Sequence, residues 1–301
     1  MHVHRASPVK IFAPAKLNLF LEVLGKRTDG FHEIETLMVP VSLCDALAFQ
    51  STPDGPIDCT CRWCYARPIH KQAARPVPTL GDNNLAVRAA RLLREAAGID
   101  AGAHIDLVKR VPLEAGLAGG SSDAAAALVA ANIGWNLNWP IARLSEVASQ
   151  LGSDVAFFLA GGVALCSGRG EKVHVEADLA PLHFVIVQPP AGLSTAEVYR
   201  HCRPAETPCR ADALVAAWRR GNGAAMGRLL HNRLEPAAAG LSPWIARVRD
   251  EFKRLDFLGS QMTGSGSAYF GLCRHARHAR RLAAALRNRG FAQVFAVAGP
   301  Q

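Results

Sequence analysis

Three polar residues interrupt two apolar segments of the chain. Lys16 and Asn18 lie within residues 14–21 (PAKLNLFL), and Asp154 lies within residues 151–159 (LGSDVAFFL). A charged or amide side chain costs several kcal/mol when it is buried without a partner. A lysine and an aspartate in such segments are therefore natural partners, and a carboxylate beside an ammonium stays ionised and can accept a proton. From spacing alone, the alternative that each side chain reaches solvent or caps a helix stays open.

A glycine-rich loop in residues 111–127 (VPLEAGLAGGSSDAAAA) leads from an expected strand into an alanine-rich helix. Its glycines let the backbone approach an anion closely, and the free N–H groups at the start of a helix stabilise phosphate. Ser121 and Ser122 add hydroxyls suited to phosphate oxygens or to a bound magnesium ion. The loop is neither a Walker A motif nor a G-x-G-x-x-G dinucleotide fingerprint. Taken alone, a purely structural glycine turn with a serine N-cap explains it equally well.

Strands and helices in the first half must position these groups. The apolar patterns predict strands over 10–24, 37–49 and 103–111 and helices over 85–97, 122–133 and 141–151. Asn84 is placed as the N-cap of the helix over 85–97, and Gly98 is placed to end it.

The second half also mixes strands with helices. Strands are expected over 183–188, 268–273 and 291–297, and helices over 211–219, 224–231, 243–255 and an arginine-rich segment ending at Gly290. Ser194 and Glu197 form a capping box that opens one more helix. Both halves are therefore α+β, and 301 residues favour two domains, which we place at 1–165 and 166–301.

The formal net charge of +9 favours an anionic partner, such as a nucleotide, a phosphorylated metabolite or a nucleic acid. Six arginines between 274 and 289 share a helical segment with apolar residues, a pattern more typical of a solvated basic face than of a nucleic-acid contact. The most apolar stretch, residues 155–166, falls short of the roughly 18 residues that span a bilayer. We expect a cytoplasmic protein with mostly reduced cysteines and no membrane partner.

Three cysteines, Cys59, Cys61 and Cys64, precede His70 within a Pro- and Arg-rich stretch, residues 51–78. Four such ligands can close a tetrahedral zinc site, but the spacing fits only partly and no second CxxC follows. Free thiols on an irregular loop are the favoured interpretation over a metal site, so no metal ligand is predicted.

Six segments together resemble the GHMP kinase superfamily and, within it, the 4-diphosphocytidyl-2-C-methyl-D-erythritol kinase family. They occur in family order over nearly the whole chain: residues 14–38 (PAKLNLFLEVLGKRTDGFHEIETLM), 84–85 (NL), the glycine-rich loop, 151–162 (LGSDVAFFLAGG), 232–235 (NRLE) and 262–271 (MTGSGSAYFG). The GKRTDGFH segment is specific to this family, whereas the glycine-rich loop alone indicates only the superfamily.

The resemblance implies a GHMP kinase fold, with an N-terminal ribosomal-S5-domain-2-like domain that binds ATP and a C-terminal ferredoxin-like domain on the substrate side. It also implies ATP-dependent phosphorylation of the 2-hydroxyl of 4-(cytidine 5′-diphospho)-2-C-methyl-D-erythritol, in the non-mevalonate route to isoprenoids. ATP, with Mg²⁺, is the expected cofactor. The expected partner is this small molecule rather than a nucleic acid, and the chain is expected to act as a monomer or homodimer.

The resemblance assigns roles by matching motifs. Lys16 and Asp154 are the catalytic pair. The ATP-binding residues are Asn84, Ala115, Gly116, Leu117, Ala118, Gly119, Gly120, Ser121 and Ser122. The substrate-binding residues are Asn18, Phe31, His32, Tyr199, Thr263, Gly264, Ser265 and Gly266. Among the latter, Asn18 contacts the sugar alcohol, His32 bonds the cytosine edge, and Phe31 and Tyr199 stack on the two faces of the base.

The sequence departs from the family pattern at several positions. Phe31 stands where a tyrosine is usual, and Glu114 and Ala118 occupy loop positions where small residues and glycine are commoner. A carboxylate facing phosphates is unfavourable, so Glu114 is expected to point away. Two other functions stay open: a GHMP kinase for another small alcohol, and a basic nucleic-acid-binding protein on an S5-like fold. The low aromatic content, 7%, argues against the second.

Overall fold

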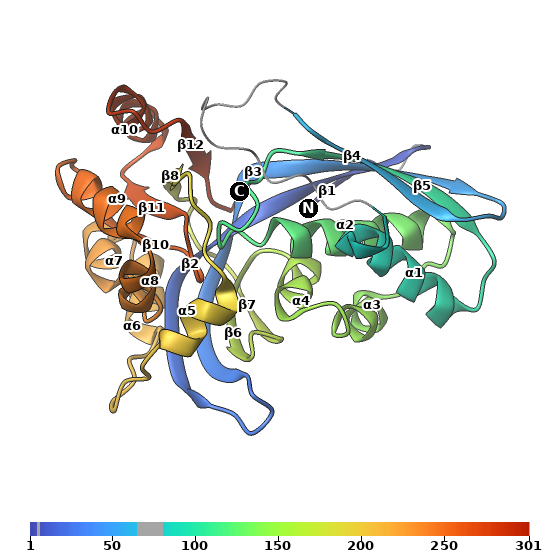
Figure 1. Cartoon of the computed structure of the whole chain (residues 1–301), viewed down its shortest axis with the longest axis horizontal. Coiled ribbons are helices and arrows are strands. Elements are labelled where there is room, and N and C mark those ends of the chain that lie inside the picture. Colours follow the sequence, from blue (N-terminus) through green and yellow to red (C-terminus); the bar gives the residue numbers. More distant parts are fainter. Residues whose placement is uncertain (5–6, 65–80, 301) are drawn as a thin grey trace.

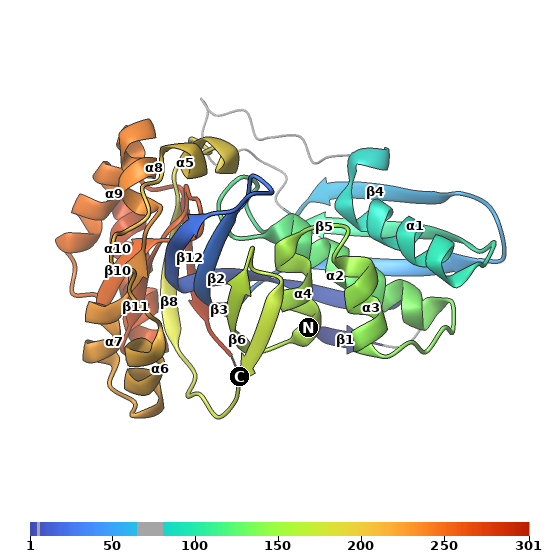
Figure 2. The ribbon, with the colours of Figure 1, turned by 90° about the horizontal axis from the view of Figure 1, so that it is seen from below.

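The computed structural model describes residues 1–4, 7–64 and 81–300, so His70 lies outside the described residues. Within them the strands form two sheets, each with helices packed against it (Figures 1 and 2). The predicted α+β class is confirmed.

The larger sheet is built around two long antiparallel strands, β2 (Val9–Lys26) and β3 (His32–Thr52). The other strands of its main path are β1 (His2–His4), β5 (Gly102–Lys109) and β4 (Ile57–Trp63), in the order β1-β2-β3-β5-β4. Three shorter strands extend it: β6 (Val163–Gly168) pairs with β3, β7 (Lys172–Glu176) pairs with β6, and β9 (His231–Asn232) pairs with β2.

Four helices cover one face of this sheet (Figure 1): α1 (Leu85–Ala97), α2 (Gly119–Gly134), α3 (Ile141–Ala148) and α4 (Ser153–Ala160). A short 3₁₀ turn, Gly81–Asn83, precedes α1. The core between helices and sheet includes Ile105, Leu128 and Phe157, each at most 1% exposed. Alanines fill most of the buried face of α2, which lets this helix lie close to the strands.

The smaller sheet has the order β10-β11-β8-β12, with every neighbour antiparallel. Its strands are β8 (His183–Gln188), β10 (Gly259–Met262), β11 (Tyr269–Cys273) and β12 (Gln293–Ala298). The helices of this half are α5 (Thr195–His201), α6 (Asp212–Arg219), α7 (Gly223–Leu229), α8 (Glu235–Leu241), α9 (Pro243–Lys253) and α10 (Ala276–Asn288).

Side chains of β8 alternate between two cores, as expected for a strand covered on both faces. Val185 and Val187 pack in one cluster with residues of α9 and α10. Phe184 and Ile186 pack in another cluster with Leu17 of β2. The two sheets therefore share one core.

The domain boundary at residue 165 stays a prediction. The strands β6 and β7, which lie at and beyond this residue, belong to the larger sheet, because β6 pairs with β3 and β7 pairs with β6.

The predicted ends of α1 are confirmed. Asn84 accepts a hydrogen bond from Ala86 N, and Gly98 ends the helix in the left-handed conformation with φ 63°. Ser194 likewise caps α5 by accepting from Glu197 N.

Two local predictions were wrong. Part of the expected irregular insertion is the strand β4, whose alternate residues Cys59 and Cys61 pack against the core. The helix expected to begin at Ser122 begins at Gly119, because Ala118 adopts the left-handed conformation, φ 54°, and serves as the N-cap. The serines therefore lie inside the first turn.

Candidate active site

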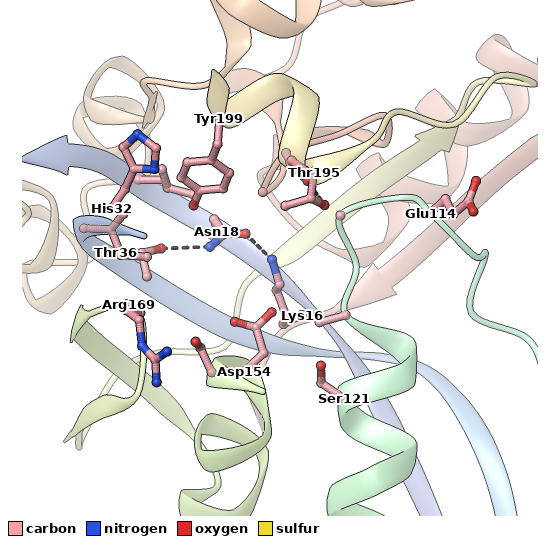
Figure 3. A pocket seen from close by; sticks show the side chains of 18 of the residues that line it. Lys16, Asn18, His32, Thr36, Glu114, Ser121, Asp154, Arg169, Thr195 and Tyr199 are labelled. Atoms are coloured by element: carbon pink, nitrogen blue, oxygen red, sulfur yellow. Dashed lines mark hydrogen bonds between the residues drawn. The ribbon is translucent and has the colours of Figure 1, made fainter. Parts of the chain in front are cut away.

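Residues from both halves of the chain line one cavity of about 840 Å³ (Figure 3). The residues singled out from the sequence that line it are Lys16, Asn18, Phe31, His32, Ala115, Gly116, Ala118, Gly119, Gly120, Ser121, Asp154, Tyr199, Gly264 and Ser265. The others are not among the residues that line it: Asn84, Leu117, Ser122, Thr263 and Gly266. Residues 130 or more positions apart in sequence thus share one pocket.

Lys16 and Asn18 reach the pocket because alternate residues of β2 face opposite sides of the sheet. Leu17 and Leu19 face the shared core instead. The register with β3 shifts just after Asn18, and such irregularities re-aim side chains locally. Both polar residues are buried, with 4% and 2% of their surface exposed, so each needs hydrogen-bond partners.

Asn18 is the centre of a buried hydrogen-bond network. Its Oδ1 accepts from Lys16 Nζ and, at 3.2 Å, from Thr263 Oγ1. Its Nδ2 donates to Thr36 Oγ1 at 2.8 Å, and that hydroxyl donates to the carbonyl of Phe20 at 2.7 Å. The amide of Asn18 is therefore fixed from three sides, and it in turn fixes the Lys16 ammonium.

Asp154 lies in the first turn of α4 and points toward Lys16 across the pocket (Figure 3). The Lys16 ammonium donates its hydrogen bond to Asn18 rather than to this carboxylate. Burial lowers the pKa of Lys16 below its ordinary value, and the negative charge of Asp154 opposes that shift. The two groups are therefore coupled electrostatically while the carboxylate stays available to a ligand.

The N-terminal end of α2 faces the pocket through Gly119, Gly120 and Ser121. A helix start of this kind presents unbonded N–H groups and the positive end of the helix dipole, and both favour phosphate. Ser122 differs from Ser121, because it is fully buried and its hydroxyl has no hydrogen-bond partner within the described residues.

Two glycines of the loop are required by packing against the protein itself. A Cβ on Gly116, which has φ +72°, would lie 2.2 Å from the carbonyl oxygen of Thr263. A Cβ on Gly119 would lie 3.0 Å from a methyl of Val111. The missing side chains thus let the loop lie close to its neighbours. Glu114 also lines the pocket, and its side chain lies away from Lys16 and Asp154 (Figure 3).

The opposite end of the pocket is aromatic. The rings of His32 and Tyr199 lie 5.1 Å apart with planes tilted by 33°. The guanidinium of Arg169 lies 4.6 Å from the centre of the Phe31 ring, which is 53% exposed. Burial, together with the charge of Lys26, lowers the pKa of His32, which favours a neutral imidazole with one donor and one acceptor nitrogen.

The second glycine-rich loop, residues 263–266, is held against β2. Asn18 N donates to Thr263 Oγ1 at 3.0 Å, and Asn232 Nδ2 donates to the carbonyls of Met262 and Gly264. Ser265 Oγ lies 2.8 Å from Thr195 Oγ1, which joins the loop to α5. The loop therefore connects Asn18 with the helix that carries Tyr199.

Family models support the assignment suggested by these motifs. The GHMP kinases N terminal domain model matches residues 84–162, and the GHMP kinases C terminal model matches residues 213–292. The 4-diphosphocytidyl-2-C-methyl-D-erythritol kinase of Pelotomaculum thermopropionicum is 44% identical over 282 residues, 93% of this chain and 94% of the relative. The enzyme of the same name from Shouchella clausii is 38% identical over 296 residues, 95% of this chain and 93% of the relative. The chain belongs to the 4-diphosphocytidyl-2-C-methyl-D-erythritol kinase family.

Solved structures agree with this family. A crystal structure of 4-(cytidine 5′-diphospho)-2C-methyl-D-erythritol kinase is 37% identical, has a TM-score of 0.79, and covers 97% of this chain and 100% of that chain. Homoserine kinase from Cytophaga hutchinsonii has a TM-score of 0.72 at 20% identity, covering 97% of this chain and 94% of that one, which shows a common fold alone. The predicted GHMP kinase fold is therefore confirmed.

The structure adds pocket residues that motif analysis of this family member missed. The polar ones among them are Lys26, Thr36, Ser153, Arg169, Thr195 and Arg200. Thr36 and Lys26 lie inside the family segment 14–38, where their polar character was visible but their orientation was not. Arg169 lies in the turn between β6 and β7, two strands that the sequence analysis did not predict.

The described part of the cysteine-rich segment, residues 51–64, does not line the pocket. All eight cysteines are free thiols, and no cluster of His, Cys, Asp or Glu among the described residues could hold a metal ion. Burial raises the pKa of Cys59 to about 12 and that of Cys61 to about 11.

In the part of the chain that the structure describes, no helix has the length and apolar character needed to cross a membrane.

Proposed function

We propose that this chain transfers a phosphoryl group from ATP to the 2-hydroxyl of 4-(cytidine 5′-diphospho)-2-C-methyl-D-erythritol. The observation that carries the proposal is one continuous pocket with Lys16 and Asp154 between a helix N-terminus and an aromatic end. A helix N-terminus suits the ATP phosphates, and aromatic rings suit a pyrimidine. Relatives that share 37–44% of their residues with this chain carry the corresponding enzyme name.

Phosphoryl transfer needs little covalent work from a protein, so positioning and charge neutralisation dominate. In the proposed mechanism the Asp154 carboxylate accepts the proton of the 2-hydroxyl as the bond to phosphorus forms. Lys16, held by Asn18, stabilises the negative charge around the transferred group. The N–H groups at the start of α2 bind the phosphates of ATP.

Mg²⁺ is proposed to enter with ATP. Proteins bind this ion together with substrate phosphates, and the hydroxyl of Ser121, which lines the pocket beside the start of α2, is suited to it. The ion would neutralise phosphate charge there. Asn84, Leu117 and Ser122 do not line this pocket, and their part in ATP binding stays a prediction.

Recognition of the cytidine is proposed to use Phe31, His32 and Tyr199. A neutral His32 offers both a donor and an acceptor to the base edge, and Tyr199 offers a ring face. The GKRTDGFH segment that carries Phe31 and His32 favours this substrate over another small alcohol, the runner-up function.

A nucleic-acid partner is not proposed, because three of the six arginines between 274 and 289 pair with carboxylates of the chain itself. Arg274 and Arg281 both pair with Asp256, at 3.0 Å and 2.7 Å, and Arg289 pairs with Glu251 at 2.7 Å. A cytoplasmic location and a monomer or homodimer stay predictions.

The deciding experiment measures ATP consumption with the cytidine substrate and with 2-C-methyl-D-erythritol 4-phosphate, which lacks the cytidine. We expect turnover only with the cytidine substrate, and phosphorus NMR should place the new phosphate on the 2-hydroxyl. Equal turnover of both compounds would contradict the substrate assignment and favour a GHMP kinase of broader specificity. Asp154→Asn is the control for contaminating ATPase.

A further inference from the structure

A buried ion cluster lies beneath the glycine-rich loop and outside the pocket lining. Lys109 Nζ, at the end of β5, pairs with Asp45 Oδ2 of β3 and, at 2.5 Å, with Asp123 Oδ2 of α2. The three side chains are at most 5% exposed. The cluster does not touch the pocket directly, so any effect on a ligand passes through the loop above it.

The cluster ties together the two ends of the loop. Lys109 is the last residue of β5, and Asp123 lies in the second turn of α2, so their ion pair closes the base of the segment 110–122. Asp45 Oδ1 accepts from the backbone N–H groups of Arg110 at 2.5 Å and Val111 at 2.8 Å. The start of the loop is thereby fixed to β3 through its backbone as well as through Lys109.

The ammonium of Lys109 also packs against the first residue of α2. A Cβ on Gly119 would lie only 3.4 Å from Lys109 Nζ. Gly119 lines the pocket and begins the helix whose N–H groups face it. Lys109 Nζ therefore lies close to the first residue of α2.

The chemistry of the cluster favours a geometric role over a stabilising one. Burying charged groups costs as much free energy as their attraction returns, and apolar replacements of buried ion pairs are often neutral or stabilising. Asp123 Oδ1 has no hydrogen-bond partner among the described residues, so this carboxyl is incompletely satisfied. What the ion pairs supply is a fixed distance and direction between β3, β5 and α2.

We propose that Asp45, Lys109 and Asp123 are positioning residues that hold the glycine-rich loop and the first turn of α2 in the conformation that binds ATP phosphates. The inference rests on the proposed function only for the identity of the nucleotide. Its test therefore measures ATP binding without the cytidine substrate.

Asp123→Ala removes the pair across the loop base but leaves the balanced pair of Lys109 and Asp45, so the chain should fold. By calorimetric titration with Mg²⁺-ATP, we expect the Kd to rise at least about 10-fold. Asp123→Asn keeps an oxygen that accepts from Lys109, and its Kd should stay within about 3-fold of wild type. The KM for the cytidine substrate should be unchanged in both. Asp106→Asn is the matched control, because Asp106 is an exposed residue of β5 that pairs with Arg62.

A folded Asp123→Ala variant with unchanged ATP affinity would overturn the inference, as would equal losses for ATP and for the cytidine substrate. If Asp123→Ala does not fold, Asp123→Ser, whose hydroxyl is too short to reach Lys109, carries the same expectation. A wild-type chain that binds ATP but does not phosphorylate the cytidine substrate would contradict the proposed function and leave this inference standing.

Discussion

Replacement of Asn18 by leucine tests whether this residue acts through Lys16. The side chain is 2% exposed, and leucine has nearly its shape, so the main loss is the set of hydrogen bonds to Lys16, Thr36 and Thr263. A hydrogen bond to a charged group contributes about 1.5 to 3 kcal/mol. If the Lys16 ammonium is held for the transition state by this bond, kcat should fall roughly 10- to 150-fold.

The assay is steady-state ADP release with the cytidine substrate, together with a double-mutant cycle. Because Asn18 acts through Lys16 in this reasoning, Asn18→Leu combined with Lys16→Met should be no slower than Lys16→Met alone. Asn288→Leu, an exposed change at the end of α10, is the control. Multiplicative losses in the double mutant would refute the reasoning, and a raised KM at normal kcat would assign Asn18 to substrate binding alone.

Four further predictions follow from the pocket and its supports. Asp154→Asn should lower kcat roughly 100-fold or more with little change in substrate KM, measured by the same ADP assay, because it removes the proton acceptor. Tyr199→Ala should raise the KM for the cytidine substrate roughly 5- to 150-fold and leave that for ATP nearly unchanged, since base stacking contributes about 1 to 3 kcal/mol. Gly116→Ala should destabilise the fold by about 2 to 6 kcal/mol in calorimetric unfolding, because its Cβ meets the Thr263 carbonyl at a positive φ. Burial, together with the nearby Asp45 carboxylate, raises the pKa of Asp123 above its ordinary value although Lys109 opposes that shift, so this group's contribution to stability should fall as pH rises above about 4; urea unfolding of Asp123→Asn should show a flatter pH dependence there.

The sequence predicted those parts of the site that depend on local pattern. Lys16, Asn18 and Asp154 were visible because polar residues in apolar segments need partners, and the structure brings all three to one pocket. The ends of α1 were visible because Asn84 and Gly98 have the local chemistry of caps.

The parts that depend on register and long-range pairing were not predictable in this way. Thr36 reaches Asn18 only through the pairing of β2 with β3, and Thr263 reaches it across a sequence separation of 245 residues. The strand β4 was missed because it lies in a stretch that is rich in Pro and Arg, a composition typical of irregular structure. Its strand conformation depends on its pairing with β5, which the local sequence does not show. Lys16 and Asp154, the partners expected from the sequence, interact electrostatically, whereas the hydrogen bond from Lys16 to Asn18, two residues along the same strand, was not expected.

The glycine-rich loop shows why one motif supports two explanations. From sequence, its glycines indicate a backbone that approaches an anion; in the structure, Gly116 and Gly119 have their missing side chains directed at Thr263 and Val111. The two explanations are compatible, because a loop that turns its N–H groups toward a ligand must press its other side against the protein. A substitution at Gly119 therefore acts on ATP by displacing the loop from Val111 and Lys109 rather than by occupying the phosphate site. Affinity for the nucleotide and packing beneath the loop should change together at this position.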